Sequence, residues 1–285
     1  MIAMTNPMTA RVALARTLLF VPGNRPDRFE KAVRSGADAM VLDLEDSVPS
    51  VDKAAARVAI ARDWTELQGL GVPLIVRINT ADGEIGRADL AWLAALPPPA
   101  AVMVPKAETV SALEQVHRAL RGVPTLALIE SAAGYAALPT LGGATGVLRL
   151  VVGHIDFMAD TGLQCDADES ELAPLRFAVN IATRLNRLAP PVDGVTVQIG
   201  DEDRLRADVR RALRFGFSGK LCIHPAQVAV VHDAFRPTAE ELAWARKVVA
   251  ADADAGGAAV QVDGRMVDLP VVLQARRTLA FAPRA

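Results

Sequence analysis

The pattern that decides the fold stands in AVMVPKAETVSALEQVHRALRGVPTLALIE, residues 101–130. Two short apolar runs, AVMVP (101–105) and TLALIE (125–130), enclose a longer amphipathic segment, an order typical of one strand–helix–strand unit. The same alternation continues in both directions along the chain. Six further strands are predicted: TLLFV (17–21), AMVLDL (39–44), PLIVRI (73–78), VLRLVVG (147–153), VDGVT (192–196) and GKLCIH (219–224).

Eight strand–helix units in series predict a TIM (β/α)₈ barrel. Several of the strands are apolar on both alternating faces, as a sheet wrapped by helices requires. The composition, 51% hydrophobic but only 4% aromatic, suits buried parallel strands better than a sandwich. A doubly wound open sheet is the alternative, because periodicity alone does not fix the number of strands.

Local signals mark several helix boundaries. Pro26 is expected to open the first helix, and Ser50 to cap the helix through AAARVAIARDW. Thr238, with Glu241 three residues later, forms a predicted capping box before LAWARKVV.

The end of the chain departs from the repeating units. ADADAGG (251–257) is predicted to be a linker, and AVQVDGRMVDL a hairpin that turns at Asp263 and Gly264. A final helix, PVVLQARRTLAFA, follows. We therefore expect a catalytic barrel over residues 1–250 and an extension over residues 251–285, which packs as a lid on a neighbouring subunit.

Charge and composition exclude several function classes. The formal net charge is −2 and the arginines are spread along the chain, which argues against a nucleic-acid partner. Cys165 and Cys222 are the only cysteines, as expected for reduced thiols in the cytoplasm, although a single disulfide stays open. The longest uncharged stretch, residues 131–148, is interrupted by glycines and a proline, so no membrane span is expected.

Charged and polar residues stand at or directly after the predicted strands. In a (β/α)₈ barrel the carboxyl ends of the strands converge on one rim, where the active sites of this fold are found. The set, in strand order, is Arg25, Glu45 and Asp46, Arg77 and Asn79, Lys106, Glu130, Asp156, Asp193, and His224.

Glu130 and Asp156 end neighbouring strands, so their carboxylates can meet at one point. Two such oxygen ligands, completed by water and substrate, suit Mg²⁺. The four histidines are scattered and show no zinc spacing. The alternative is that the two acids cap helices or pair with Arg77 and Lys106.

Arg77 is a candidate for binding a carboxylate or a developing oxyanion. Its alternative role is an ion pair with Glu45 or Asp46. Asp43 and Glu45 alternate to the same side of the strand. We therefore expect the acids of DLEDSV, Asp43, Glu45 and Asp46, to stand behind the metal ligands and hold them in position.

Lys106 has the residue type of a Schiff-base lysine, but beside two carboxylates an electrostatic role is favoured. His154 is expected to be a core or loop residue.

Seven segments in register resemble the CitE-like enzymes, the citrate lyase β-subunit, citramalyl-CoA lyase and malyl-CoA lyase group of the HpcH/HpaI aldolase superfamily. The resemblance runs from residue 16 to about residue 280. The segments are RTLLFVPGNRPDRFEKA (16–32), GADAMVLDLEDSV (36–48), VRIN (76–79), VPKAE (104–108), ALIES (127–131), DGV (193–195) and GFSGKLCIHPAQV (216–228).

The resemblance implies a modified TIM barrel and a divalent metal, Mg²⁺ or alternatively Mn²⁺. It also implies cleavage of a 3-hydroxyacyl-CoA into acetyl-CoA and a 2-oxo acid by retro-Claisen or retro-aldol chemistry. It assigns the metal to Glu130 and Asp156, and the thioester or enolate oxygen to Arg77. Asp268 matches an acid that a neighbouring subunit supplies for proton transfer, in line with a homotrimer or hexamer. Family positions that line the thioester and CoA site correspond to Phe20, Arg25, Lys31 and Pro225.

Two other functions stay open: an aldolase acting on free 4-hydroxy-2-oxo acids, and a citrate lyase β-subunit that works only with an acyl-carrier partner. Many relatives read G-x-E-D-L-x-x-D after the sixth strand, whereas this chain reads GHIDFMAD (153–160). Asp156 is kept, but His154 and Ile155 replace its usual neighbours. The sequence therefore leaves the acyl group, the direction of the reaction and the oligomeric state open.

Overall fold

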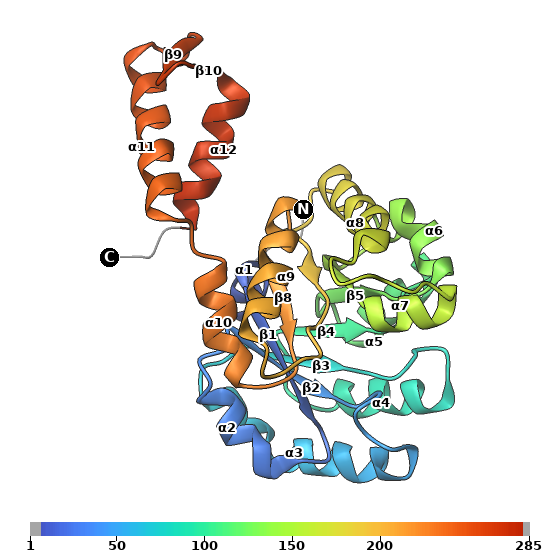
Figure 1. Ribbon diagram of the computed structural model, residues 1–285. Coiled ribbons are helices and arrows are strands. Elements are labelled where there is room, and N and C mark those ends of the chain that lie inside the picture. Colours follow the sequence, from blue (N-terminus) through green and yellow to red (C-terminus); the bar gives the residue numbers. More distant parts are fainter. Residues whose placement is uncertain (1–6, 282–285) are drawn as a thin grey trace. The chain divides into compact units, whose positions relative to one another are not determined.

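Eight parallel strands form a closed barrel in a computed structural model that describes residues 7–281 (Figure 1). Each strand pairs with the next, and the last pairs with the first, so the open-sheet alternative is excluded and the predicted barrel is confirmed. The strands are β1 (Thr17–Pro22), β2 (Ala39–Asp43), β3 (Leu74–Arg77), β4 (Ala101–Val104), β5 (Thr125–Ile129), β6 (Val147–Val152), β7 (Val192–Asp193) and β8 (Gly219–Cys222).

The strand predicted over residues 192–196 is the main difference, because β7 ends at Asp193. The carbonyl of Gly194 accepts a hydrogen bond from Lys220 Nζ, and the carbonyl of Thr196 accepts one from Gln227 Nε2 at 2.8 Å. Side chains thus replace the neighbouring strand as the partners of this backbone. The segment bends away from the ladder as a result.

Helices surround the barrel and connect its strands (Figure 1). Arg149, inside β6, donates to the carbonyls of Val12 and Ala15 and so ties the first helix to the amino-terminal end of the barrel. The helices of this part are α1 (Pro7–Leu14), α2 (Phe29–Val33), α3 (Lys53–Gly69), α4 (Glu84–Ala94), α5 (Val110–Ala119), α6 (Ala132–Leu141), α7 (His154–Thr161), α8 (Ala173–Leu185), α9 (Glu202–Arg214) and α10 (Ala226–Ala234), with the short 3-10 turns η1 (Pro26–Arg28), η2 (Ser50–Asp52) and η3 (Ser170–Leu172).

Pro26 opens η1 as predicted, but the predicted cap at Ser50 is wrong. Ser50 begins the turn η2, and the residue before α3 is Asp52, whose side chain makes no capping hydrogen bond. The extra 3-10 turn places Ser50 too far from the free N–H groups of α3. None of the described helices is both long and apolar enough to cross a membrane.

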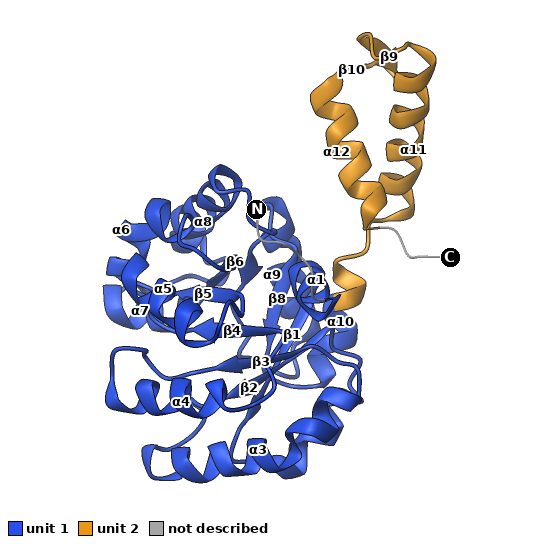
Figure 2. Ribbon diagram, turned by 180° about the vertical axis from the view of Figure 1, so that it is seen from behind, with its two compact units in different colours: residues 1–231 blue, residues 232–285 orange. Residues whose placement is uncertain are grey.

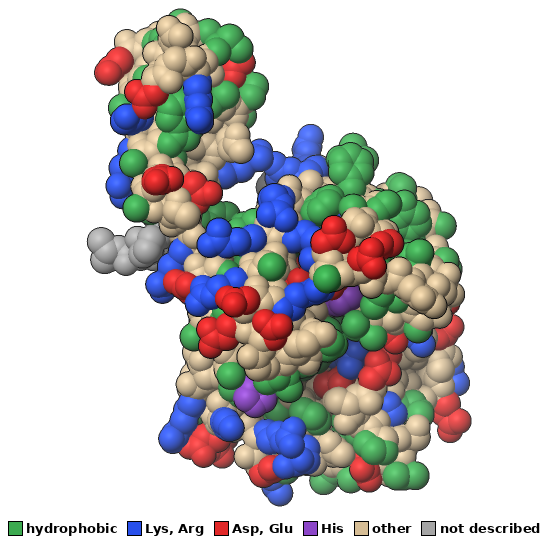
Figure 3. Space-filling view, in the orientation of Figure 1, with side chains coloured by type: hydrophobic (Ala, Val, Ile, Leu, Met, Phe, Trp, Pro, Cys, Tyr) green, Lys and Arg blue, Asp and Glu red, His purple; other side chains and the backbone are tan. Residues whose placement is uncertain are grey.

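The barrel core consists of aliphatic side chains from the strands. Val41, Ile75, Met103, Leu126 and Val151 belong to one fully buried cluster. Because both faces of the strands are covered, apolar residues occupy consecutive positions rather than alternate ones. On the face in Figure 3, acidic and basic side chains are interspersed.

The chain divides into two compact units, Met1–Val231 and His232–Ala285 (Figure 2). In the second unit, α11 (Ala239–Asp254) packs on α12 (Leu269–Ala280), with the hairpin of β9 (Val260–Val262) and β10 (Arg265–Val267) between them in sequence. The core of this unit consists of small and aliphatic side chains from α11, β10 and α12: Ala245, Val248, Val267, Val272 and Ala275.

Two predictions for this unit are confirmed. Thr238 and Glu241 form the capping box of α11, and Asp263 and Gly264 make the hairpin turn with positive φ angles. The predicted linker over residues 251–257 is wrong in its first half, because α11 continues to Asp254. Asp252 pairs with Arg276 at 3.0 Å, which ties the last turn of α11 to α12.

Candidate active site

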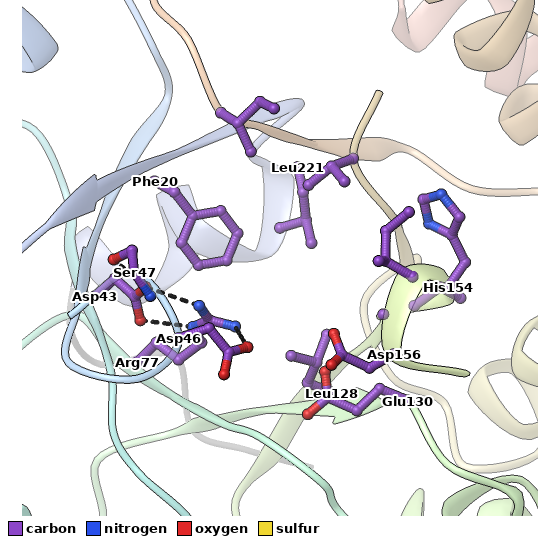
Figure 4. Close-up of a pocket in the computed structure, with 15 residues that line it drawn as sticks. Phe20, Asp43, Asp46, Ser47, Arg77, Leu128, Glu130, His154, Asp156 and Leu221 are labelled. Carbon is purple, nitrogen blue, oxygen red and sulfur yellow. Dashed lines mark hydrogen bonds and ion pairs between the residues drawn. The ribbon is translucent and has the colours of Figure 1, made fainter. Parts of the chain in front are cut away.

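A cavity of about 350 Å³ opens at the carboxyl ends of the barrel strands (Figure 4). Its lining combines a charged side with an apolar side. The polar lining residues are Asp43, Asp46, Ser47, Arg77, Glu130, His154 and Asp156, and the others are Phe20, Leu128, Val152, Gly153, Ile155, Val195, Leu221 and Ile223.

Glu130 and Asp156 come together in this cavity, as the sequence predicts. Glu130 directly follows β5, and Asp156 lies in the first turn of α7, which follows β6. Figure 4 shows the two carboxylates side by side. Gly153 makes room for them, because a Cβ at this position would lie only 2.7 Å from Glu130 Oε2.

The alternative roles of the two acids do not match the contacts. Helix α6 is capped by Ser131, not by Glu130. Glu130 Oε1 accepts a hydrogen bond from the backbone N–H of Lys106 at 2.8 Å, but the Lys106 side chain is exposed and does not line the cavity. Within residues 7–281, neither Glu130 nor Asp156 forms an ion pair with a basic side chain.

The electrostatics of this pair fit a cation. The pKa of Glu130 is raised to about 7. Burial raises it most, the hydrogen bond from the backbone N–H of Lys106 lowers it, and the charge of Asp156 raises it by more than the charge of Arg77 lowers it. A divalent cation would reduce the repulsion between these two carboxylates, which have no basic partner among the described residues. No group of three or more His, Cys, Asp or Glu side chains in the described part of the chain could hold a metal. A metal here would thus keep water or substrate oxygens as its remaining ligands, the usual habit of Mg²⁺.

Arg77 forms the ion pairs that the sequence left as an alternative (Figure 4). Its Nε and Nη2 each lie 2.7 Å from an oxygen of Asp43, and its Nη1 lies 2.7 Å from Glu45 and 3.6 Å from Asp46. The ring of Phe20 covers one face of the guanidinium, with 4.8 Å between Cζ and the ring centroid. Arg77 therefore faces the cavity in a fixed orientation.

The acids of DLEDSV are connected to Arg77 rather than to Glu130 or Asp156. Burial alone would raise the pKa of Asp43, but the two hydrogen bonds from Arg77 hold it below its ordinary value. Burial raises the pKa of Glu45 to about 8, since one ion pair with Arg77 does not offset the loss of water. Asp43 is thus the charged partner of Arg77 at neutral pH.

The remaining predicted residues lie around the cavity or apart from it. Phe20 lines the cavity. Arg25 pairs with Asp27 and is 44% exposed, and Lys31 is exposed on α2. Pro225 follows β8, the neighbour of β1, so its loop adjoins the loop that carries Arg25.

Asp268 belongs to the second unit. It is the residue before α12, and within residues 7–281 its carboxylate accepts one long hydrogen bond, 3.5 Å, from the backbone N–H of Val271.

The comparisons with known proteins agree with this architecture. A family model described as "HpcH/HpaI aldolase/citrate lyase" matches residues 16–225. The chain belongs to the HpcH/HpaI aldolase/citrate lyase family. Membership makes it a lyase, and its relatives include citrate lyase β-like proteins and a citramalyl-CoA lyase.

Relatives of this HpcH/HpaI family member carry several activity names. A citrate lyase subunit beta-like protein of Deinococcus radiodurans is 36% identical over 96% of this chain and 99% of its own length. A (3S)-malyl-CoA thioesterase of Cereibacter sphaeroides is 32% identical over 94% of both chains. A mitochondrial citramalyl-CoA lyase of Rattus norvegicus is 30% identical over 94% of this chain and 86% of its own.

The solved structures that resemble this HpcH/HpaI member include CitE proteins. CitE of Mycobacterium tuberculosis, in complex with magnesium, acetoacetate and coenzyme A, superposes with a TM-score of 0.83 at 32% identity, covering 95% of this chain and 99% of its own.

Asp193, which the sequence placed among the strand-end residues of the rim, does not line the cavity but belongs to a second, buried charged cluster. Asp193 is fully buried and pairs with Arg176 at 3.0 Å, and Arg176 also pairs with Glu169 at 2.6 Å. Lys220 and His154 lie close to Asp193 in the same buried region, where burial lowers the pKa of His154 to about 4. His154 is thus a buried residue, as expected, at the wall between this cluster and the cavity. The signals in the sequence were Asp193 at the end of its strand and the lysine inside the apolar run GKLCIH.

Proposed function

We propose that this HpcH/HpaI family member is a Mg²⁺-dependent lyase that cleaves a 3-hydroxyacyl-CoA into acetyl-CoA and a 2-oxo acid. One observation carries the proposal: Glu130 and Asp156 present adjacent carboxylates in the cavity without a basic partner among the described residues. The similar CitE structure that contains magnesium, acetoacetate and coenzyme A supports it.

Glu130 and Asp156 would hold the metal, Mg²⁺ or alternatively Mn²⁺. When bound, the ion supplies Lewis-acid polarisation of the hydroxyl and carboxylate oxygens of the substrate. The carboxylate of Asp268, acting first as a general base, would take the hydroxyl proton. The oxygen electrons then form the carbonyl of the 2-oxo acid while the adjacent carbon–carbon bond breaks. The bonding pair passes to the thioester fragment as an enolate.

Arg77 would stabilise the enolate oxygen. A guanidinium has five N–H groups, and two of those of Arg77, on Nε and Nη2, donate to Asp43, while Nη1 forms an ion pair with Glu45. The other N–H groups of Nη1 and Nη2 can donate to one oxygen in the cavity. Because Asp43 and Glu45 fix the fork in advance, little reorganisation is needed during the reaction.

Asp268 would protonate the enolate carbon to give acetyl-CoA. Its carboxylate accepts a long hydrogen bond at the start of α12, which leaves it able to turn toward a bound thioester. We assign its delivery to a neighbouring subunit of a homotrimer or hexamer, with residues 251–285 packed on that neighbour. Arg25 in the loop after β1, Lys31 on α2 and Pro225 after β8 would bind the CoA portion.

The test is an acyl-CoA assay with the purified full chain. Citramalyl-CoA, malyl-CoA and citryl-CoA are each incubated with Mg²⁺, and both the 2-oxo acid and free CoA are measured, so that carbon–carbon cleavage is separated from thioester hydrolysis. Free 4-hydroxy-2-oxo acids serve as the comparison. We expect 2-oxo acid release from a thioester only, and its loss in Glu130→Ala and Asp156→Ala.

Asp203→Ala is the matched control, because Asp203 is an exposed carboxylate in the first turn of α9. Full Mg²⁺-dependent cleavage by both cavity variants would refute the proposal.

A further inference from the structure

The cavity of the proposed lyase has an apolar side opposite its carboxylates. Figure 4 shows Phe20 and Leu221 directed into the space that Glu130 and Asp156 face from the other side. Ile155 and Val195 extend the same apolar lining. A substrate held at the two carboxylates would thus have its other substituents against hydrocarbon.

The cavity also lacks a free cation. Arg77 is the only lysine or arginine among the described lining residues, and Asp43 and Glu45 bind its fork while Phe20 covers its face. The other nitrogen-bearing side chain, His154, is 4% exposed and packs against Gly194, where a Cβ would lie 2.1 Å from Nδ1. The N–H groups of Arg77 that Asp43 does not take are the ones assigned to the enolate oxygen. A second carboxylate on the 2-oxo acid would thus be buried without a partner of its own, which is unfavourable.

The apolar side has room beyond the cavity itself. A second cavity of about 660 Å³ adjoins the first, and the two share His154, Ile155 and Val195 in their linings. The second cavity is partly polar, but its arginine, Arg204, is already paired with Glu169 and Asp208. Ile155 directly precedes Asp156 and is 42% exposed. Its side chain thus stands where the metal-site cavity opens into additional space.

We propose that the cavity selects thioesters whose 2-oxo acid fragment carries an alkyl side chain, ethyl as well as methyl, and that Ile155 determines this selection. The inference rests on the proposed lyase function. Burying one additional methylene typically changes specificity by about 10- to 200-fold. We expect the substrates that release pyruvate and 2-oxobutanoate to exceed those that release glyoxylate or oxaloacetate by roughly 10-fold or more in kcat/KM.

The experiment compares four CoA thioesters that release glyoxylate, pyruvate, 2-oxobutanoate and oxaloacetate. It uses the wild type, Ile155→Lys, Ile155→Ala and Ile181→Lys. Ile181 is the matched control, since it is 41% exposed on α8 and lines neither cavity. Ile155→Lys supplies the missing cation, so it should shift the preference toward oxaloacetate release, whereas Ile155→Ala should weaken the alkyl preference. Ile181→Lys should leave all four ratios as in the wild type.

A second measurement is independent of turnover. Calorimetric binding of free 2-oxobutanoate and oxaloacetate in the presence of Mg²⁺ should show the same order and the same reversal in Ile155→Lys. Cleavage without alkyl preference, or a preference that Ile155→Lys leaves unchanged in both assays, would overturn this inference while the lyase function stands. Absence of cleavage with all four thioesters would instead overturn the lyase function on which the inference rests.

Discussion

Replacing Arg77 by methionine should destabilise the barrel unit by leaving a buried charge without its partner. Asp43 is fully buried and receives two hydrogen bonds of 2.7 Å from Arg77. Removing one member of a buried ion pair costs about 3–5 kcal/mol. We expect the lower end, about 3 kcal/mol, because Glu45 has a pKa of about 8 and is mostly neutral at pH 7, and because Asp43 keeps its hydrogen bond from Ser47.

The loss should depend on pH. Arg77 holds the pKa of Asp43 below its ordinary value, so the ion pair stabilises the fold above the unfolded pKa of aspartate. This contribution disappears as the pH falls through the lower, folded pKa. The difference between the wild type and Arg77→Met should therefore be full at neutral pH and shrink in acid.

Urea unfolding followed by tryptophan fluorescence measures the effect, since Trp64 and Trp92 lie in the barrel unit. A loss of about 3 kcal/mol lowers the melting temperature by roughly 6–12 °C in a domain of this size. The control is the double variant Asp43→Asn/Arg77→Met, in which the uncompensated charge is also absent. It should recover roughly 2 kcal/mol of the loss. A single variant within about 0.5 kcal/mol of the wild type, or a double variant as unstable as the sum of both singles, would refute the reasoning.

Three further predictions concern the site. Gly153→Ala should displace the Glu130 carboxylate and weaken Mg²⁺ binding by roughly 10- to 100-fold, measured by calorimetry; unchanged affinity would show that the carboxylate does not need this space. Removing Mg²⁺ with a chelator should abolish cleavage and also lower the melting temperature, because the ion binds only the folded chain; equal melting curves with and without metal would contradict this. Asp268→Asn should lower turnover by about 10²–10⁴-fold without changing Mg²⁺ affinity. If Asp268 acts across subunits, mixing the Asp268→Asn and Asp156→Asn variants should restore activity. Mixtures as inactive as the separate variants would argue against action across subunits.

The barrel itself could be predicted from the sequence because each strand is a short apolar run with its own boundary signals. The exception is the segment after β7, where the carbonyls of Gly194 and Thr196 bond to the side chains of Lys220 and Gln227 instead of to a neighbouring strand. Those partners are distant in sequence, so no local pattern announces them. The linker prediction failed over ADAD (251–254) for the same reason. Asp252 in the last turn of α11 pairs with Arg276 of α12, a residue that is distant in sequence.

The candidate site was predictable to the extent that it depends on strand ends. Glu130 and Asp156 lie together because their strands are neighbours, and this follows from topology alone. The partner of Arg77 cannot be predicted from topology, because an arginine at the end of β3 can reach Asp43, Glu45 or a substrate oxygen. Likewise, the buried cluster around Asp193 depends on its ion pair with Arg176. Arg176 lies within α8, and an arginine within a helix on the outside of the barrel would be expected to face the solvent. Only three-dimensional packing distinguishes these cases.

The most direct test of the central claim is a calorimetric titration of Mg²⁺ into the wild type, Glu130→Gln and Asp156→Asn, with Asp203→Asn as the control. If the two cavity carboxylates hold the metal, each cavity variant should lose more than about 100-fold in affinity, and the control should bind as the wild type does. Wild-type affinity in both cavity variants would contradict the claim, because the metal would then be held elsewhere.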